Sequence, residues 1–219
     1  MADGPEERDG AVGAAYSGRA EEYAALFGAL AQQADDDVRR ITAWRDATAG
    51  PLLDAGCGPG HWTVLLGADG REAIGIDVSA GFLVIARTHP GPRFLLGSFR
   101  ALPFADGVLG GILAWYSLIH LPPEDLPAVL DEFARVLGDG GGLLIGYADG
   151  PAGEPFDHAV ATAWYHRAEE LGELLAAAGF TVTDHETRRD EGHRPHGSIR
   201  AVRRAGRSVT ERESDPASA

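Results

Sequence analysis

The chain has 219 residues, 44% hydrophobic and 24% charged, which suits one globular domain with a buried core. Its 19 basic side chains are all arginine, and 33 Asp and Glu residues give a formal net charge of −14, which speaks against a nucleic-acid partner or a polybasic membrane anchor. A single cysteine excludes an intrachain disulfide, and the polar N-terminus and the lack of a long apolar run favour a cytoplasmic protein.

The two ends of the chain lack periodic apolar positions. Residues 1–14 and 206–219 are small, charged or turn-forming, and they predict disordered tails.

Residues 15–50 predict an N-terminal helical segment. Large side chains recur there at helical spacing, as on one helix face (Tyr16, Tyr23, Leu26, Phe27 and Leu30). A second helix is expected over 38–47, before the Gly50-Pro51 breaker.

Short apolar strands then alternate with amphipathic helices. The strands are expected at 52–55, 72–76, 93–96, 108–115 and 143–147, and the helices at 61–66, 79–88 and up to 137. Beyond residue 150 the pattern predicts a helix at 167–178 and two strands, at 180–186 and 198–202. This alternation predicts an α/β fold in which helices cover both faces of a parallel sheet, within one core domain over 51–205.

The most informative segment is the turn that follows the first strand, Asp54-Ala55-Gly56-Cys57-Gly58-Pro59-Gly60. Glycines at alternate positions allow a tight turn and a close approach of a ligand to the backbone. Asp77 ends the next strand, 17 residues after Gly60, where a carboxylate can accept both ribose hydroxyls of an adenosine. The spacing leaves open which adenosine compound binds. A dinucleotide motif would place its third glycine one residue later, and a P-loop would need a lysine.

Five segments, in this order, resemble the class I S-adenosylmethionine-dependent methyltransferases, most closely the small bacterial branch that acts mostly on small molecules. They are Leu53-Asp54-Ala55-Gly56-Cys57-Gly58-Pro59-Gly60, Gly75-Ile76-Asp77-Val78-Ser79, Ala101-Leu102-Pro103-Phe104, Tyr116-Ser117-Leu118-Ile119-His120 and Glu132-Phe133-Ala134-Arg135-Val136-Leu137-Gly138-Asp139-Gly140-Gly141. The resemblance covers about residues 16–203. It implies a Rossmann-like fold with a mostly parallel seven-stranded sheet, helices on both faces and a helical lid over 15–50.

The resemblance also implies a cofactor site for S-adenosylmethionine and its product S-adenosylhomocysteine. Asp77 would take the ribose hydroxyls. The other residues carried over from the family's motifs would contact the methionine end or the adenine: Asp54, Gly56, Cys57, Gly58, Val78 and Trp115, with Tyr16 and Tyr23 on the lid. Trp115 is equally compatible with the sheet core. The acid that usually accepts the adenine amino group is missing, and Ser98 and Phe99 occupy its place.

The acceptor side is less well defined. Tyr116 is expected as a catalytic and substrate-binding residue, and Tyr165 as a second substrate contact. His120 follows the fourth strand, and an imidazole with an ordinary pKa near 6.5 suits a general base, although a structural hydrogen-bonding role is the alternative. His193 and His196 flank Pro195, but two histidines without a further ligand favour a solvated loop, so no metal is expected.

The function implied by the resemblance is methyl transfer from S-adenosylmethionine to a hydroxyl or amine of a small metabolite. Two alternatives stay open: a related protein that binds the cofactor without methylating, as a cyclase or binding module, and a protein methyltransferase. We expect a monomer or homodimer with a small-molecule acceptor and without a nucleic-acid or membrane partner.

Overall fold

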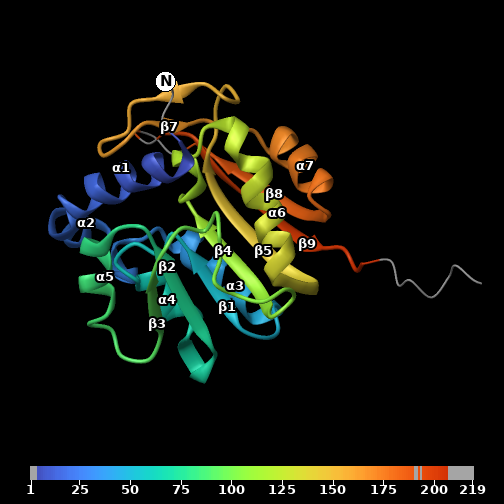
Figure 1. Cartoon of the computed structure of the whole chain (residues 1–219), viewed down its shortest axis with the longest axis horizontal. Helices are drawn as coiled ribbons and strands as arrows, with labels where there is room; N and C mark the ends of the chain where they lie inside the picture. The colour runs from blue at the N-terminus through green and yellow to red at the C-terminus, as the bar shows by residue number, and fades with distance from the viewer. Residues whose placement is uncertain (1–3, 190–191, 193, 207–219) are drawn as a thin grey trace, which may run out of the picture.

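A seven-stranded sheet organises the computed structural model, which describes residues 4–189, 192 and 194–206 (Figure 1). Its strand order is β3-β2-β1-β4-β5-β9-β8. The strands are β1 (Leu52–Ala55), β2 (Ala73–Asp77), β3 (Arg93–Leu96), β4 (Leu109–Trp115), β5 (Leu137–Ala148), β8 (Phe180–Arg188) and β9 (His196–Arg203). The first five pair in parallel, whereas β9 runs antiparallel to β5 and β8. The order reverses between β1 and β4, and ligands bind at such a switch point in open α/β sheets.

Helices cover both faces of this sheet, as the alternating pattern predicts (Figure 1). On one face lie α3 (Asp35–Ala47), α4 (His61–Leu66) and α5 (Ala80–Ala86), and on the other α6 (Leu126–Val136) and α7 (Ala168–Ala177). Each face has its own apolar core. Phe133 and Phe180 are fully buried in the core beneath α6 and α7, and Ile41 and Trp44 are buried in the core beneath α3.

Three features differ from the sequence prediction. The glycine run at 138–142 belongs to β5, which pairs with β4 across a register shift, because glycine can follow an irregular extended path. A small hairpin of β6 (Pro155–Phe156) and β7 (Ala163–Trp164) occupies the segment after residue 150. The expected helix face over 16–30 is broken at Gly18, and α2 (Ala20–Phe27) leaves Leu26 and Phe27 exposed.

The largest correction concerns the N-terminus. Residues 5–14, expected in a disordered tail, form most of helix α1 (Pro5–Ser17), which lies against α5 (Figure 1). This helix has no apolar stripe. It docks instead through Gly13, packed on the Val78 backbone, and through Ser17, whose hydroxyl accepts from the Gly81 N–H at 3.1 Å. Polar docking of this kind leaves no periodic signal in the sequence. The other predicted tail, at 206–219, lies outside the described residues except for Gly206.

Two matched substitutions on α1 test this docking. A Cβ added at Gly13 would lie 2.5 Å from the Val78 carbonyl oxygen, whereas a Cβ at Gly10 would meet nothing within 4 Å. Alanine favours a helix over glycine by about 0.5–1 kcal/mol. We therefore expect Gly10→Ala to increase hydrogen-exchange protection of the α1 amides and Gly13→Ala to decrease it. Equal gains in protection would show that α1 does not pack on Val78.

Candidate active site

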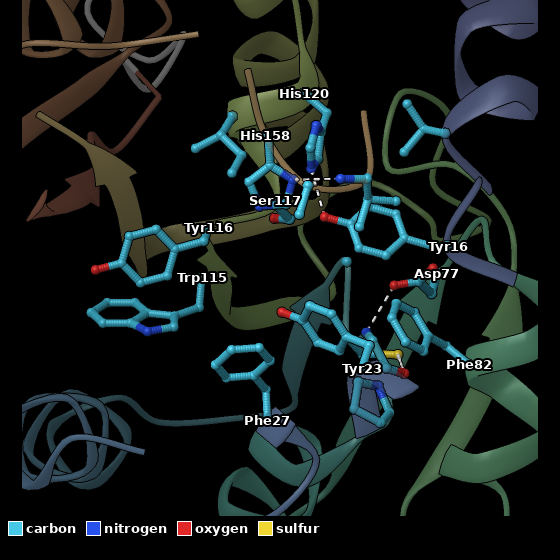
Figure 2. Close-up of a pocket in the computed structure, with 18 of the residues that line it drawn as sticks. Tyr16, Tyr23, Phe27, Asp77, Phe82, Trp115, Tyr116, Ser117, His120 and His158 are labelled. Atoms are coloured by element: carbon cyan, nitrogen blue, oxygen red, sulfur yellow. Dashed lines mark hydrogen bonds between the residues drawn. The ribbon is translucent and has the colours of Figure 1, made fainter. Parts of the chain in front are cut away.

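A cavity of about 970 Å³ lies at the carboxyl ends of β1, β2 and β4, under α1, α2 and the loop between β6 and β7. This volume is at the upper end of the roughly 300–1,000 Å³ typical of small-molecule sites. Most of the residues expected at the site line it: Tyr16, Tyr23, Gly56, Cys57, Gly58, Asp77, Val78, Ser98, Phe99, Trp115, Tyr116 and His120. Asp54 and Tyr165 do not belong to its wall. The arrangement brings residues that are distant in sequence around one cavity (Figure 2).

The glycine turn forms the floor. Gly56, Gly58 and Gly60 all have positive φ, at 79°, 53° and 92°. Residues with a side chain rarely adopt this backbone conformation. A Cβ at Gly56 would also lie 2.3 Å from the Ser117 Cβ. The turn therefore requires glycine for its path and for its packing. Burial raises the pKa of the Cys57 thiol within this turn and keeps it protonated, so that it packs as a small apolar group.

Asp77 fastens the turn to the neighbouring strand. Its carboxylate oxygens accept the N–H of Gly58 at 2.8 Å and the N–H of Ser79 at 2.7 Å. Burial raises the pKa of Asp77, and these backbone donors act in the opposite direction. The side chain is 9% exposed, at the cavity wall. A carboxylate has further lone pairs, so Asp77 can accept hydroxyl groups from a ligand while it keeps both backbone contacts.

Asp54 lies beneath the turn, outside the cavity wall. It is 1% exposed and accepts a hydrogen bond from Thr63 Oγ1 at 2.6 Å. Burial raises the pKa of Asp54 to about 7. A cationic ligand above the turn would therefore favour the ionised form of Asp54 through its field.

Aromatic side chains from α1 and α2 close the cavity. Tyr16 and Tyr23 lie with ring centroids 5.8 Å apart, and both contact Phe82 of α5, at 5.3 Å and 5.2 Å (Figure 2). Burial raises the pKa of both phenols, so they are neutral hydrogen-bond donors. These contacts join both N-terminal helices to the α5 side of the cavity.

His120 has a defined tautomer. Its Nδ1 lies 2.9 Å from the Thr162 carbonyl, which can only accept, so Nδ1 carries the proton. Its Nε2 is then the acceptor for the Tyr16 hydroxyl, 2.7 Å away (Figure 2). Burial lowers the pKa of His120, so the imidazole is neutral at pH 7. A neutral imidazole with its lone pair aimed into a cavity can accept a proton from a bound ligand.

The far end of the cavity is aromatic and rich in histidine. Trp115 is buried yet lines the cavity, so it belongs both to the core and to the site. Tyr116, directly after β4, has φ 54°, a strained conformation for a tyrosine, and strained residues of this kind cluster at functional sites. Phe156 faces the cavity, and Tyr165 packs behind it with ring centroids 4.5 Å apart. Tyr165 therefore lies behind the cavity wall, next to Phe156 and Arg194, which both line the cavity.

Several lining residues escaped the sequence analysis. His158 follows β6 and lies 5.1 Å from the His120 ring, and burial lowers its pKa to about 4. His61, at the start of α4, is buried, and neither ring nitrogen has a partner among the described residues. His196, predicted in a solvated loop, is instead the first residue of β9 and lines the cavity, whereas His193 lies outside the described residues. For His61 and His158 the sequence offered only the residue type as an indication, since the first follows the glycine turn and the second lies in a loop without a periodic pattern.

Two further features are absent from the described part of the chain. No group of three or more His, Cys, Asp or Glu side chains within it could hold a metal ion. Within the same residues, no helix is long and apolar enough to span a membrane.

Comparisons with known proteins agree with this geometry. Residues 52–141, from β1 into β5, match the family described as "Methyltransferase domain". An uncharacterized protein of Mycobacterium tuberculosis is 33% identical over 175 residues, 75% of this chain and 57% of that protein. A malonyl-(acyl-carrier protein) O-methyltransferase of Serratia marcescens is 33% identical over 135 residues, 61% of this chain and 51% of that protein. The chain spans about half the length of these curated relatives.

Solved structures share the whole fold. The 1,6-didemethyltoxoflavin-N1-methyltransferase of Burkholderia thailandensis, crystallised with 1,6-didemethyltoxoflavin and S-adenosylhomocysteine, is 20% identical with a TM-score of 0.76, over 93% of this chain and 92% of that one. The (4+2)-cyclase SpnF is also 20% identical with a TM-score of 0.76, over 90% of this chain and 97% of that one. The chain therefore contains a segment that matches a methyltransferase domain, within the fold that the solved S-adenosylhomocysteine-bound methyltransferase also has.

Proposed function

We propose that the protein transfers a methyl group from S-adenosylmethionine to a hydroxyl or amine of a small molecule. The observation that carries the proposal is the pairing of the glycine turn with Asp77, whose carboxylate bonds the Gly58 N–H at 2.8 Å and faces the cavity. This pairing sets a ribose acceptor beside a backbone surface on which the methionine part of the cofactor can lie. The match of residues 52–141 to a methyltransferase domain supports the same cofactor.

The chemistry needs alignment and removal of one proton. The cofactor's sulfonium makes its methyl group electrophilic, so the acceptor atom attacks the methyl carbon, the carbon–sulfur bond breaks and S-adenosylhomocysteine leaves. In this proposal, His120 Nε2 takes the acceptor's proton, and Tyr16 gives up its hydrogen bond to that nitrogen as the acceptor enters. Trp115, Tyr116 and Phe156 supply an apolar wall that excludes water.

The size and shape of the site favour a small acceptor over a folded protein. The tyrosines of α1 and α2 and the loop between β6 and β7 cover part of the cavity, which leaves less room for an acceptor than an open surface does. The −14 charge of the chain further disfavours RNA.

The test is incubation of the protein with methyl-labelled S-adenosylmethionine and a panel of small hydroxyl and amine metabolites, read by mass spectrometry. We expect label in one class of acceptor and equimolar S-adenosylhomocysteine. Calorimetry that shows no binding of either cofactor form would overturn the proposal. Cofactor binding together with an acceptor that is transformed but unlabelled would establish the non-methylating alternative instead.

A further inference from the structure

At the adenine end of the proposed cofactor site, the segment that follows β3 provides no acidic side chain. Ser98 and Phe99 follow β3 and line the cavity. A serine hydroxyl can accept only a weak hydrogen bond from the adenine amino group, and here this hydroxyl already donates a hydrogen bond to a carboxylate. That carboxylate is Asp9, which reaches Ser98 from helix α1.

The position of Asp9 follows from the strand order. Asp77 holds the glycine turn of β1 on one side, and on the other its backbone carbonyl accepts the N–H of Gly97, at the end of β3. A ligand whose ribose lies at Asp77 and whose methionine part lies over the turn must therefore extend its base toward β3. Val78, Ser98 and Asp9 line that end of the cavity.

Among the five carboxylates in the cavity wall (Asp9, Glu22, Asp37, Asp77 and Asp157), Asp9 is the one bonded to the segment after β3. Its Oδ2 accepts from Ser98 Oγ, and its Oδ1 accepts from Arg100 Nε at 2.9 Å. Its side chain is 19% exposed, so the carboxylate is largely withdrawn from solvent. Each oxygen retains a lone pair for a further donor.

An ion-pair network fixes Asp9 there. Arg100 bonds Asp9 and also Asp125 at 2.9 Å, and Arg8 of α1 bonds the same Asp125. Two cations and two anions thus alternate between α1 and the core, with side chains between 12% and 27% exposed. Moving α1 away would leave these partly buried charges without their partners, so the network favours this one position of the helix.

We infer that Asp9, supplied by helix α1, is the residue that recognises the exocyclic amino group of adenine in the cofactor. The inference rests on the proposed function, since it requires that S-adenosylmethionine binds in this cavity. It makes α1 part of the cofactor site, so that docking of the helix and recognition of the base depend on the same carboxylate. It also accounts for Ser98, which orients Asp9 from the place where the family usually has an acid.

The test compares S-adenosylhomocysteine with its 6-deamino analogue, in which purine replaces adenine. We expect the wild-type protein to bind the analogue at least about tenfold more weakly, because a charged acceptor loses its donor. In Asp9→Ala the two dissociation constants should become nearly equal. Asp125→Ala is the matched control: it breaks the same network and loosens α1, but it keeps Asp9, so the preference for the amino group should remain. Calorimetry gives each ratio, and circular dichroism checks that the variants are folded.

If Asp9→Ala kept the wild-type ratio of the two dissociation constants, the inference would be overturned, and the role of Asp9 would be limited to holding α1 in place. The conservative variant Asp9→Asn provides a second measurement if Asp9→Ala does not fold, and it should bind with an intermediate ratio. If the proposed function itself were wrong, the wild-type protein would bind neither ligand, so this outcome can be distinguished from failure of the inference on Asp9.

Discussion

Replacing Asp77 by alanine should raise the dissociation constant for S-adenosylhomocysteine at least about 100-fold, because hydrogen bonds to a charged group each contribute about 1.5–3 kcal/mol. Asp77 has two tasks in this argument. It accepts the ribose hydroxyls in the proposed complex, and it already holds the N–H groups of Gly58 and Ser79. Alanine removes the acceptor for the ligand and releases the glycine turn at the same time.

A second variant separates these tasks. Asp77→Asn keeps one carbonyl acceptor and the shape of the side chain, so we expect it to bind more weakly than wild type and more tightly than Asp77→Ala. Asp106→Ala is the control for general loss of charge, because Asp106 is exposed, pairs with Arg135 and lies outside the cavity wall. It should bind as wild type does. Titration calorimetry measures all three, and unchanged affinity in a folded Asp77→Ala would exclude the ribose role.

The sheet could be predicted because parallel strands carry a strong local signal. β1 and α4 have the predicted bounds, and β2 ends at the predicted Asp77. These strands are buried on both faces, so their residues are apolar except for Asp54 and Asp77 at their carboxyl ends. The glycine turn between β1 and α4 shows in the sequence because its positive φ values disfavour residues with side chains. Chain order alone then brings the glycine turn and Asp77 to the same end of the sheet.

The covering parts of the site could not be predicted in the same way. Helix α1 is attached through ion pairs and a glycine contact, which leave no periodicity, so its composition suggests a tail. Asp9 acts through a contact that spans more than 80 positions of sequence, to Ser98. Phe156 and His158 lie on and after a two-residue strand, too short for a pattern. This part of the cavity is formed by tertiary contacts between residues that are distant in sequence, and such contacts leave no local pattern.

Replacing His120 by alanine should lower the single-turnover rate of methyl transfer about 100-fold or more, the effect of losing a general base, while cofactor affinity changes far less. The reason is positional. The Nε2 lone pair of His120 points into the cavity toward Tyr16, and the Thr162 carbonyl fixes the proton on Nδ1. Rapid-quench measurement with the acceptor found by the labelling screen gives the rate.

The pH dependence of the rate gives a second, independent test. Burial lowers the pKa of His120 below its ordinary 6.5, so the neutral form persists below that pH, and the rate should fall only as pH drops through the lowered pKa. The Tyr16 hydroxyl can donate to Nε2 only when that nitrogen is unprotonated, so this bond also favours the neutral form. Tyr16→Phe should therefore raise the pKa of His120 in the enzyme without acceptor, and move the acid limb of the kcat/KM profile, which reports that form, to higher pH.

His120→Gln distinguishes a base from a structural hydrogen-bonding residue. Glutamine can still donate to the Thr162 carbonyl and so support the loop between β6 and β7, but its amide cannot accept a proton near neutral pH. If His120 is the base, the rate of His120→Gln should stay as low as that of His120→Ala, and the acid limb should vanish from both profiles. Recovery of the wild-type rate by glutamine would show that the histidine only positions the loop, and the acceptor proton would then have to leave by another route, such as water or an acceptor that is already ionised.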